Sequence, residues 1–522
     1  MDSGDSGLSA PGNSWNRPWT GLLLLGLFLN VLVVFTSNLG LDTHVHMARG
    51  VEEENTGEAR LPWGHTRPID PMASDPSYAP IEEEGWFEII PNSEIETHTL
   101  GLGLMLILCA TAYLVFWKLF GHLSAISTTA LISIHPTFIF ATGRVFPEVA
   151  MAILGLMMVL PILIHRIKPN WKGALLSGFF SSIVMAGILQ VKGIPIHLSI
   201  IYGSLITGWH ILDGIERMRI LTRSPKNVAI ISSIGIGAIT LLYGGLFGTG
   251  TIGVIGEYPE RYSFALIIAA FDAIGIFALF GMVLWPFLRG TIQNLEIIEN
   301  HSIATIIGLI IGLSTVITIY IAALWTYEAA LWNAEWPTVM WTMGNNGRYI
   351  SMLMLPAFLL IHLVGQINPL AETQANPQSK KRALMLGIIL ILPLSILTAI
   401  HGQTMWTDDA GEAMVDLGLK DGDDFLFISD ATLGMHWLYT FHIEVNPTGE
   451  NNITGHWRDP DSGWIEDLNR NEPLPNRGDL KNVRFIILSP EIEVIPNDWT
   501  VVDEGKAPWM NGGGTWRVLG QL

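Results

Sequence analysis

The chain has 522 residues, of which 49% are hydrophobic and 14% are charged, and its mean hydropathy is +0.40. This composition excludes an ordinary soluble protein and is typical of a protein that crosses a membrane several times. The formal net charge is −19, and a chain without a basic surface for phosphates is not expected to bind nucleic acid. The single cysteine, Cys109, lies in an apolar run, so we interpret it as a packing residue.

Apolar runs long enough to cross about 30 Å of hydrocarbon recur along the chain. The first follows residues 1–18, a Gly-, Ser- and Pro-rich segment that we expect to be a disordered cytoplasmic tail. No small-residue cleavage site follows this run, so we interpret it as an uncleaved signal anchor. We expect a polytopic α-helical membrane protein of about eleven transmembrane helices, near residues 19–38, 98–118, 124–142, 147–165, 172–191, 194–214, 227–249, 263–288, 302–324, 349–367 and 383–401.

Basic residues are concentrated in every second connection between these runs. One set of connections carries most of them, namely Lys118, Arg166, Lys168, Lys172, Arg217, Arg219, Arg223, Lys226, Arg289, Lys380, Lys381 and Arg382. The other set carries Arg144, Lys192, Arg261 and Arg348. Because cytoplasmic loops are enriched in Lys and Arg, the N-terminus is predicted to be cytoplasmic, and an odd number of helices places the C-terminus outside.

Acidic residues are concentrated in two segments of the predicted outer face. Residues 39–98 hold 13 acidic and 3 basic residues, and residues 402–522 hold 21 acidic and 8 basic residues. The first segment corresponds to a long outer loop, 39–97, within a transmembrane domain of residues 19–401. In the second segment, apolar runs at 424–429 and 482–489 predict buried strands, and a helical pattern lies between them. We therefore expect a small extracytoplasmic α/β domain over residues 402–522.

Asp42, His44 and His46 alternate directly after the first apolar run. The surroundings of a carboxylate at the membrane boundary can tune its pKa, which suits a general base. The alternative is that Asp42 only caps a turn or faces water. A divalent metal bound by all three residues is a further alternative, which needs an extended backbone to direct them to one side. No cofactor is otherwise indicated.

A second motif joins two apolar runs between His135 and Glu148. Pro147 followed by Glu148 is a typical helix start, so Glu148 could simply complement the helix dipole. Arg144 could similarly extend its charge to the membrane interface. In the functional interpretation, Arg144 and Glu148 place a cation and a carboxylate beside Asp42. We expect His135 to be a hydrogen-bonded packing residue.

A third motif, Gly347-Arg348-Tyr349, opens the apolar run 349–367. A guanidinium at this position could bind a phosphate through two hydrogen bonds. Alternatively, Arg348 and Tyr349 are interface anchors. Lys192 is a further candidate partner for a phosphate.

In this order, the motifs resemble those of membrane glycosyltransferases of the GT-C superfamily. The resemblance is strongest to the branch of dolichyl-phosphate-mannose protein mannosyltransferases and lipid A aminoarabinose transferases. It rests on Asp42 after the first span, the junction from His135 to Glu148, and Arg348-Tyr349 before an apolar run. It covers residues 19–401 and hardly touches the C-terminal segment.

The resemblance implies transfer of a sugar from a polyprenyl-phosphate carrier to a glycan, lipid or protein acceptor, at the extracytoplasmic face of a cell membrane. It implies that Asp42 is the base, with inversion at the sugar, that Glu148, the acid of the junction, is a second catalytic residue, and that Arg144 and Arg348 hold the lipid phosphate. The other residues expected to bind substrate are His44, His46, Tyr349 and Lys192.

The sequence departs from the family pattern in two places. Thr43 stands where an acidic neighbour of the first-loop aspartate is expected, and the tail has no W-W-D-like motif, which argues against an oligosaccharyltransferase. Two other classes of function stay open. A transporter or lipid flippase could use Asp272, an acidic residue within a predicted span. A non-catalytic scaffold could display the outer domain.

Overall fold

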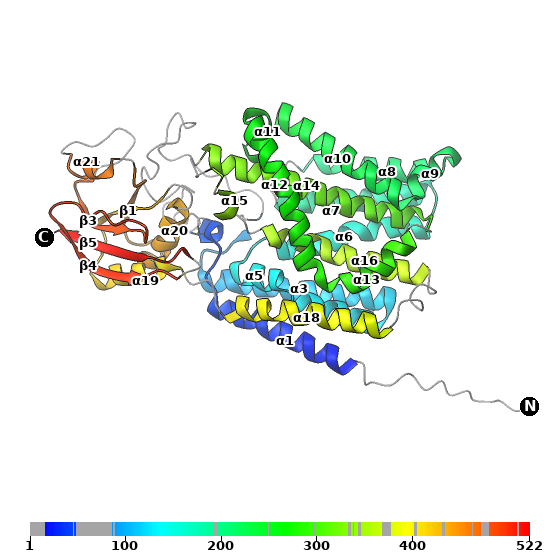
Figure 1. Ribbon diagram of the computed structural model, residues 1–522, viewed down its shortest axis with the longest axis horizontal. Coiled ribbons are helices and arrows are strands. Elements are labelled where there is room, and N and C mark those ends of the chain that lie inside the picture. Colours follow the sequence, from blue (N-terminus) through cyan, green and yellow to red (C-terminus); the bar gives the residue numbers. More distant parts are fainter. Residues whose placement is uncertain are drawn as a thin grey trace, which may run out of the picture.

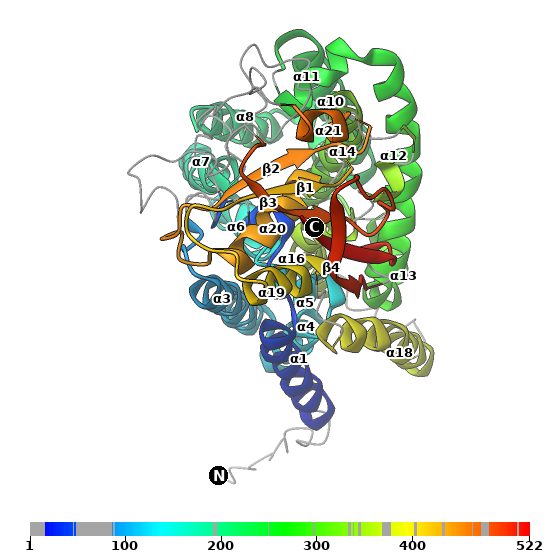
Figure 2. The same ribbon diagram turned by 90° about the vertical axis from the view of Figure 1, so that its left-hand side faces the viewer.

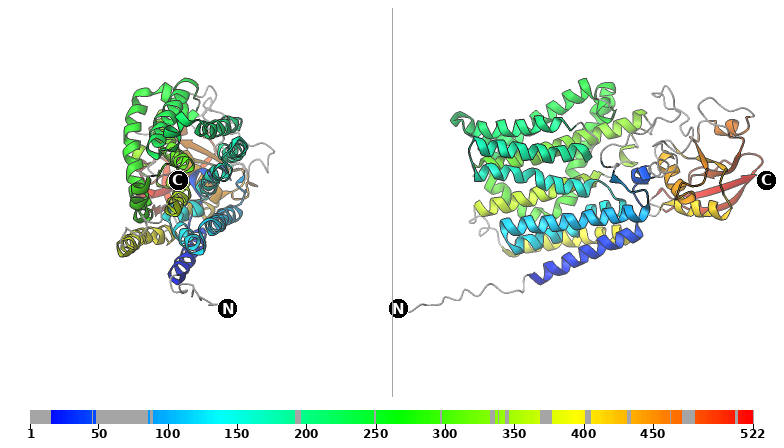
Figure 3. Two further views of the ribbon diagram at one scale, coloured as in Figure 1. Left: turned by 90° about the vertical axis from the view of Figure 1, so that its right-hand side faces the viewer. Right: turned by 180° about the vertical axis from the view of Figure 1, so that it is seen from behind.

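The computed structural model describes residues 16–521 except 45, 48–85, 87–88, 192–195, 249, 296–297, 332–335, 338, 343–345, 368–376, 401–404, 431–433, 462, 471–479 and 509–510. Within the described part, long helices run side by side along one axis, and a small sheet covers one end of the bundle (Figure 1). Helix α1 begins at the opposite end from the sheet (Figures 1 and 3). The start of α1 and the C-terminal sheet therefore lie at opposite ends of the bundle, and which end faces the cytoplasm stays a prediction.

The bundle has long helices that coincide with the predicted apolar runs and short helices that lie between them. Its elements are α1 (Asn16–Thr36), α3 (Glu94–Phe120), α4 (His122–Ser133), α5 (Pro136–Arg144), α6 (Glu148–Ile167), α7 (Trp171–Val191), α8 (Leu198–Asp213), η2 (Glu216–Met218), α9 (Arg219–Arg223), α10 (Pro225–Phe247), α11 (Gly250–Glu257), α12 (Pro259–Phe280), η3 (Gly281–Val283), α13 (Trp285–Leu295), α14 (His301–Leu331), α15 (Val339–Thr342), η4 (Asn346–Ile350), α16 (Ser351–Ile367) and α18 (Pro377–Ile400).

Among the described residues, nine helices are long and apolar enough to cross a membrane, and the pair α4–α5 makes ten if it counts as one bent span. The chain is thus a multi-pass membrane protein. The remaining predicted span, 194–214, corresponds to α8, whose 16 residues extend only about 24 Å. The predicted span 124–142 is bent by 59° between α4 and α5. Pro136 begins α5 there, and its ring leaves no N–H to continue α4.

The C-terminal unit contains a five-stranded sheet with the order β2-β1-β3-β5-β4, built from β1 (Asp424–Ile428), β2 (Thr454–Arg458), β3 (Val483–Leu488), β4 (Trp499–Lys506) and β5 (Thr515–Gln521). β1 pairs in parallel with β2 and β3, whereas β5 is antiparallel to β3 and β4. The helices of this unit are α19 (Trp406–Asp416), α20 (Gly434–Val445) and α21 (Trp464–Leu468). The α/β character agrees with the prediction, and both predicted strands are present as β1 and β3.

Side chains of the central strands alternate between the two faces of the sheet, as the pleat requires. Phe425 and Phe427 pack with α19 and α20, whereas Leu426 and Ile428 pack beneath Trp464 of α21. The first of these clusters also contains residues of the membrane part, namely Leu39, Met47, Trp86, Ile90 and Val145. One apolar core therefore joins the sheet to the end of the bundle, where α20 and the sheet lie over the helix ends (Figure 2).

Candidate functional site

The turn between α5 and α6 faces the residues that follow α1. Val145 is in the left-handed conformation with φ 57°, which is strained for a β-branched residue and is the kind of strain found at functional sites. The carbonyl of Arg144 accepts hydrogen bonds from the Gly40 N–H at 3.0 Å and from Thr43 Oγ1 at 3.2 Å. The carbonyl of Val145 accepts one from Trp86 Nε1 at 3.2 Å. The second motif thus holds the first motif in place.

Residues 41–44, 46 and 47 are helical, and the Asp42 side chain is exposed. Successive residues of a helix are rotated by about 100°, so Asp42 and His46, four residues apart, share one face, whereas His44 points to the opposite side. The extended backbone that a metal site at these three residues needs is therefore absent. The ring of His44 is buried, and its Nδ1–H donates to the Gly40 carbonyl at 3.0 Å. Burial lowers the pKa of His44 to about 4, so this ring is neutral at pH 7.

Arg348 belongs to the short helix η4, which leads into α16. Its guanidinium lies over the ring of Phe146, with Cζ 4.5 Å from the ring centroid, and Nε is 3.4 Å from Oε1 of Glu148. Nη2 also donates a hydrogen bond of 3.4 Å to the Tyr349 hydroxyl. The Glu148 side chain is 3% exposed, and Glu148 is also the first residue of α6, where the helix dipole favours an acid. Its carboxylate thus complements the dipole of α6 and also pairs with a specific cation. That cation is Arg348 and not Arg144.

Arg144 ends α5, with its Cζ 5.1 Å from the centroid of the Phe140 ring. Its Nε is buried and has no hydrogen-bond partner among the described residues. The Arg144 and Arg348 guanidiniums are close enough to repel each other, and Asp42 attracts both electrostatically. A buried donor without a partner costs free energy, and two neighbouring cations favour an anion between them. This end of the bundle is therefore suited to bind an anionic group next to the Asp42 carboxylate.

The remaining predicted site residues differ in how they relate to this pair of arginines. Tyr349 is buried, and its ring meets Tyr320 of α14 edge to face, with centroids 6.3 Å apart. His46 is partly buried on the short helix that carries Asp42. Lys192 lies outside the described residues, so its role stays a prediction. His135 is hydrogen-bonded to Thr137 and to the carbonyl of Phe280, which confirms the packing interpretation.

The C-terminal unit adds acidic side chains beside this end of the bundle. Asn38 Nδ2 donates to Oδ2 of Asp408 at 2.5 Å, linking the residue after α1 to α19. Burial raises the pKa of Asp408 to about 6. Burial, reinforced by the neighbouring acids Asp408, Glu94 and Glu412, raises the pKa of Glu444 in α20 to about 7. The interface between the bundle and the C-terminal unit is thus sensitive to protonation.

Several residues of the site were not identified from the sequence. The ring of Phe146 contacts the Arg348 guanidinium, but nothing in the sequence distinguishes Phe146 from the other aromatic residues of this apolar junction. Tyr320 and Asp408 lie far along the chain from the motifs they contact, and no local pattern marks them. Three histidines that meet at the other end of the bundle were also missed, although each stands near the end of an apolar run.

No family model matches the sequence, and no curated protein matches it either. Solved structures with a similar arrangement include ArnT from Cupriavidus metallidurans bound to undecaprenyl phosphate, with 12% identity and a TM-score of 0.44 over 97% of this chain and 98% of that chain. ArnT in the apo state has 11% identity and a TM-score of 0.33 over 97% of each chain. The Archaeoglobus fulgidus oligosaccharyltransferase in complex with zinc and sulfate has 13% identity and a TM-score of 0.39, over 90% of this chain and 67% of that chain.

These neighbours are membrane glycosyltransferases, the class that the sequence resemblance indicates. All three TM-scores are below 0.5. We therefore base the proposed function on the geometry of the site.

Proposed function

We propose that this protein is a membrane glycosyltransferase of the GT-C type, which transfers a sugar from a polyprenyl-phosphate carrier to an acceptor at the extracytoplasmic face. The observation that carries the proposal is the electrostatic attraction of the exposed Asp42 carboxylate to both Arg144 and Arg348, together with an Arg144 Nε that is buried and has no hydrogen-bond partner among the described residues. A lipid-linked donor presents its phosphate at the depth of the lipid headgroups. Arg144 and Arg348 lie at the ends of membrane helices, which is the same depth.

The reaction needs a base and a stabilised leaving group. Asp42 accepts the proton of the acceptor hydroxyl while the hydroxyl oxygen forms a bond to the anomeric carbon. The bond from the anomeric carbon to the phosphate oxygen breaks, and the electron pair leaves with the phosphate. Arg144 and Arg348 stabilise the charge that develops there. Attack from the face opposite the phosphate inverts the anomeric configuration.

Glu148 acts on this step by positioning Arg348. Its carboxylate forms an ion pair with that guanidinium at 3.4 Å from Nε, without a hydrogen bond among the described residues, and the Phe146 ring lies against the face of the same group. Both contacts leave the Nη atoms to meet the phosphate, apart from the bond to the Tyr349 hydroxyl. Neutral His44 fixes the backbone that presents Asp42, while His46, Tyr349 and Lys192 are assigned to substrate binding.

The direct test is to follow lipid-linked sugars in cells that lack the protein. We expect a polyprenyl-phosphate sugar to accumulate, detectable by mass spectrometry, and to return to its normal level when the wild-type gene is restored. Asp42→Asn should fail to restore it, whereas Asp272→Asn should succeed. Restoration by Asp42→Asn would remove the proposed base. Failure of Asp272→Asn alone would favour the transporter or flippase alternative.

A further inference from the structure

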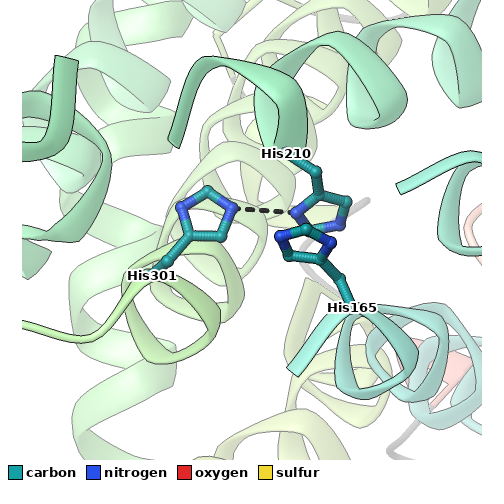
Figure 4. Close-up of side chains that lie close together, drawn as sticks. All are labelled: His165, His210 and His301. Carbon is teal, nitrogen blue, oxygen red and sulfur yellow. Dashed lines mark hydrogen bonds between the residues drawn. The ribbon is translucent and has the colours of Figure 1, made fainter. Parts of the chain in front are cut away.

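Three histidines from three helices meet at the end of the bundle that lies away from the C-terminal unit (Figure 4). His165 stands near the end of α6, His210 near the end of α8, and His301 begins α14. Their exposed fractions are 7%, 2% and 7%. One ring nitrogen from each residue lies within 4.8 Å of the others, and they are the one group among the described residues with such spacing. The cluster is therefore separate from the site around Asp42.

The hydrogen bonds of His301 determine which of its nitrogens is free to act as a ligand. Its Nδ1 is 3.1 Å from the carbonyl oxygen of Thr222 and 3.7 Å from Oδ1 of Asp213. Both neighbours are acceptors, so Nδ1 carries the proton and Nε2 carries the lone pair. That lone pair points at Nδ1 of His210, 2.8 Å away. A carboxylate and a carbonyl behind a histidine are the usual partners of a metal-bound imidazole.

The other two rings have nitrogens that a metal ion could use. Nε2 of His210 is 2.9 Å from the Ser177 hydroxyl, which can either donate or accept a proton. His210 can therefore hold its proton on Nε2 and present a lone pair at Nδ1. The His165 ring stacks on His210 with centroids 4.2 Å apart. Its Nδ1 is buried and has no hydrogen-bond partner in the described part of the chain.

Asp213 is fixed in place behind this cluster. It accepts hydrogen bonds from Thr222 Oγ1 at 2.8 Å and from Arg223 Nε and Nη2 at 2.8 and 2.9 Å. The bidentate pair orients the carboxylate toward His301 and reduces its freedom to become a ligand itself. The donor set is thus three imidazoles, supported by a held carboxylate.

We propose that His165, His210 and His301 bind one divalent transition-metal ion, with zinc as the best match. Imidazole suits zinc, and three histidine ligands with a solvent molecule form a tetrahedral zinc site. The ligand atoms are Nε2 of His301, Nδ1 of His210 and a ring nitrogen of His165. At zinc–nitrogen bonds of about 2.0–2.1 Å, these nitrogens stand about 3.3 Å apart, so the His210 and His301 rings separate slightly when the ion enters.

Ion binding requires no net loss of protons from the three rings. The proton between His210 and His301 moves from Nδ1 to Nε2 of His210, where the Ser177 oxygen accepts it. The ion links α6, α8 and α14, and through Thr222 and Asp213 it also holds α9. Its role is to fix the end of the bundle opposite the proposed reaction.

The test uses the full-length protein in detergent, stripped with a chelator and reloaded with Zn²⁺ or Co²⁺. Wild-type protein should hold about one ion per chain by elemental mass spectrometry. His165→Gln, His210→Gln and His301→Gln should each lose it, whereas His197→Gln, an exposed histidine before α8, should keep it. His44→Gln should also keep the ion, which would show that the ion does not bind at the Asp42 end of the bundle. Asp213→Asn should weaken binding about 10- to 100-fold.

A measurement on wild-type protein alone covers the case in which a variant does not fold. The zinc X-ray absorption spectrum should show about three imidazole nitrogens at about 2.0–2.1 Å. An ion-free wild-type protein, an ion retained by all three glutamine variants, or a spectrum without imidazole would overturn the proposal. The three rings would then be a hydrogen-bonded packing cluster.

Discussion

Arg348 and Glu148 are 200 residues apart in sequence, yet the Nε of one lies 3.4 Å from the Oε1 of the other at the end of the helix bundle. The pair joins the helix η4 to the start of α6, and the Phe146 ring lies against the same guanidinium. The carboxylate is almost fully buried, so each charge depends on the other. Their pairing sets the direction from which Arg348 can meet an anion.

Glu148→Gln should therefore act through Arg348. The amide retains the shape but leaves the guanidinium without its counter-charge, and loss of one partner of a buried pair costs about 3 kcal/mol. We expect a lower unfolding temperature and weaker binding of undecaprenyl phosphate. Arg348→Lys should not restore binding, because a lysine neither stacks on Phe146 nor offers a planar fork. Unchanged stability and affinity in Glu148→Gln would show that the pair is not structural.

Asp42→Asn tests the base separately from the anion site. The substitution removes a proton acceptor but leaves both arginines in place. We expect the rate of sugar transfer to fall about 100- to 10,000-fold, while binding of undecaprenyl phosphate stays the same or strengthens. Single-turnover kinetics together with binding by native mass spectrometry would measure both. Equal losses of rate and affinity would assign Asp42 to binding instead.

At Gly40 the chain after α1 packs tightly against the α5–α6 turn. A Cβ atom at this position would lie 2.5 Å from Cε1 of Phe146. Gly40→Ala should destabilise the protein by about 1–3 kcal/mol and displace Asp42 from the arginines. Gly103→Ala in α3 is a matched control, because a Cβ there meets nothing within 4 Å. Thermal unfolding of both variants, followed by a transfer assay, would show whether only Gly40 matters.

The buried carboxyl groups at the interface with the C-terminal unit should make the stability of the protein depend on pH. The pKa of Glu444 is raised by burial to about 7 and that of Asp408 to about 6. A raised carboxyl pKa means that the folded state binds the proton more tightly, so this stabilisation is present at low pH and is lost as pH rises toward 7. His44, with a pKa lowered to about 4, acts in the opposite direction between about pH 4 and 6.5.

Comparison with a variant isolates the carboxyl contribution. The unfolding temperature of Glu444→Gln relative to wild type should increase as pH rises from 5 to 8, because the variant has no charge to bury. Glu450→Gln, an exposed acid after α20, should show a constant difference. A flat difference for Glu444→Gln as well would mean that this carboxyl is not protonated in the folded protein near pH 6.

The predicted apolar runs match the helices because about twenty consecutive apolar residues are the length that a membrane-spanning helix needs. The local exceptions have local causes. Pro136 divides one run, and α8 is shorter than its apolar stretch suggested. Strands β2, β4 and β5 were missed because none shows the apolar run that marked β1 and β3. The residues of β2 are mostly polar, those of β4 are largely exposed, and those of β5 mix apolar and polar side chains.

The candidate site was only partly predictable. Because successive spans cross the membrane in opposite directions, counting them predicts that Asp42, Arg144, Glu148 and Arg348 lie at the same end of the bundle. The partner of each charge is decided by packing between segments distant in sequence, so the pairing of Glu148 with Arg348 could not be deduced. The helical conformation at Asp42 could not be predicted either, because three alternating polar residues are also compatible with an extended backbone.

Binding of undecaprenyl phosphate to the purified protein tests the central claim most directly. Native mass spectrometry in detergent should show one lipid bound to the wild-type chain, and Arg144→Gln and Arg348→Gln should each weaken binding about 10- to 100-fold, the loss expected when a charged hydrogen bond is removed. Arg217→Gln, an exposed arginine before α9, should bind as wild type does. Equal affinity in all four proteins, or no binding by the wild type, would contradict the proposed phosphate site.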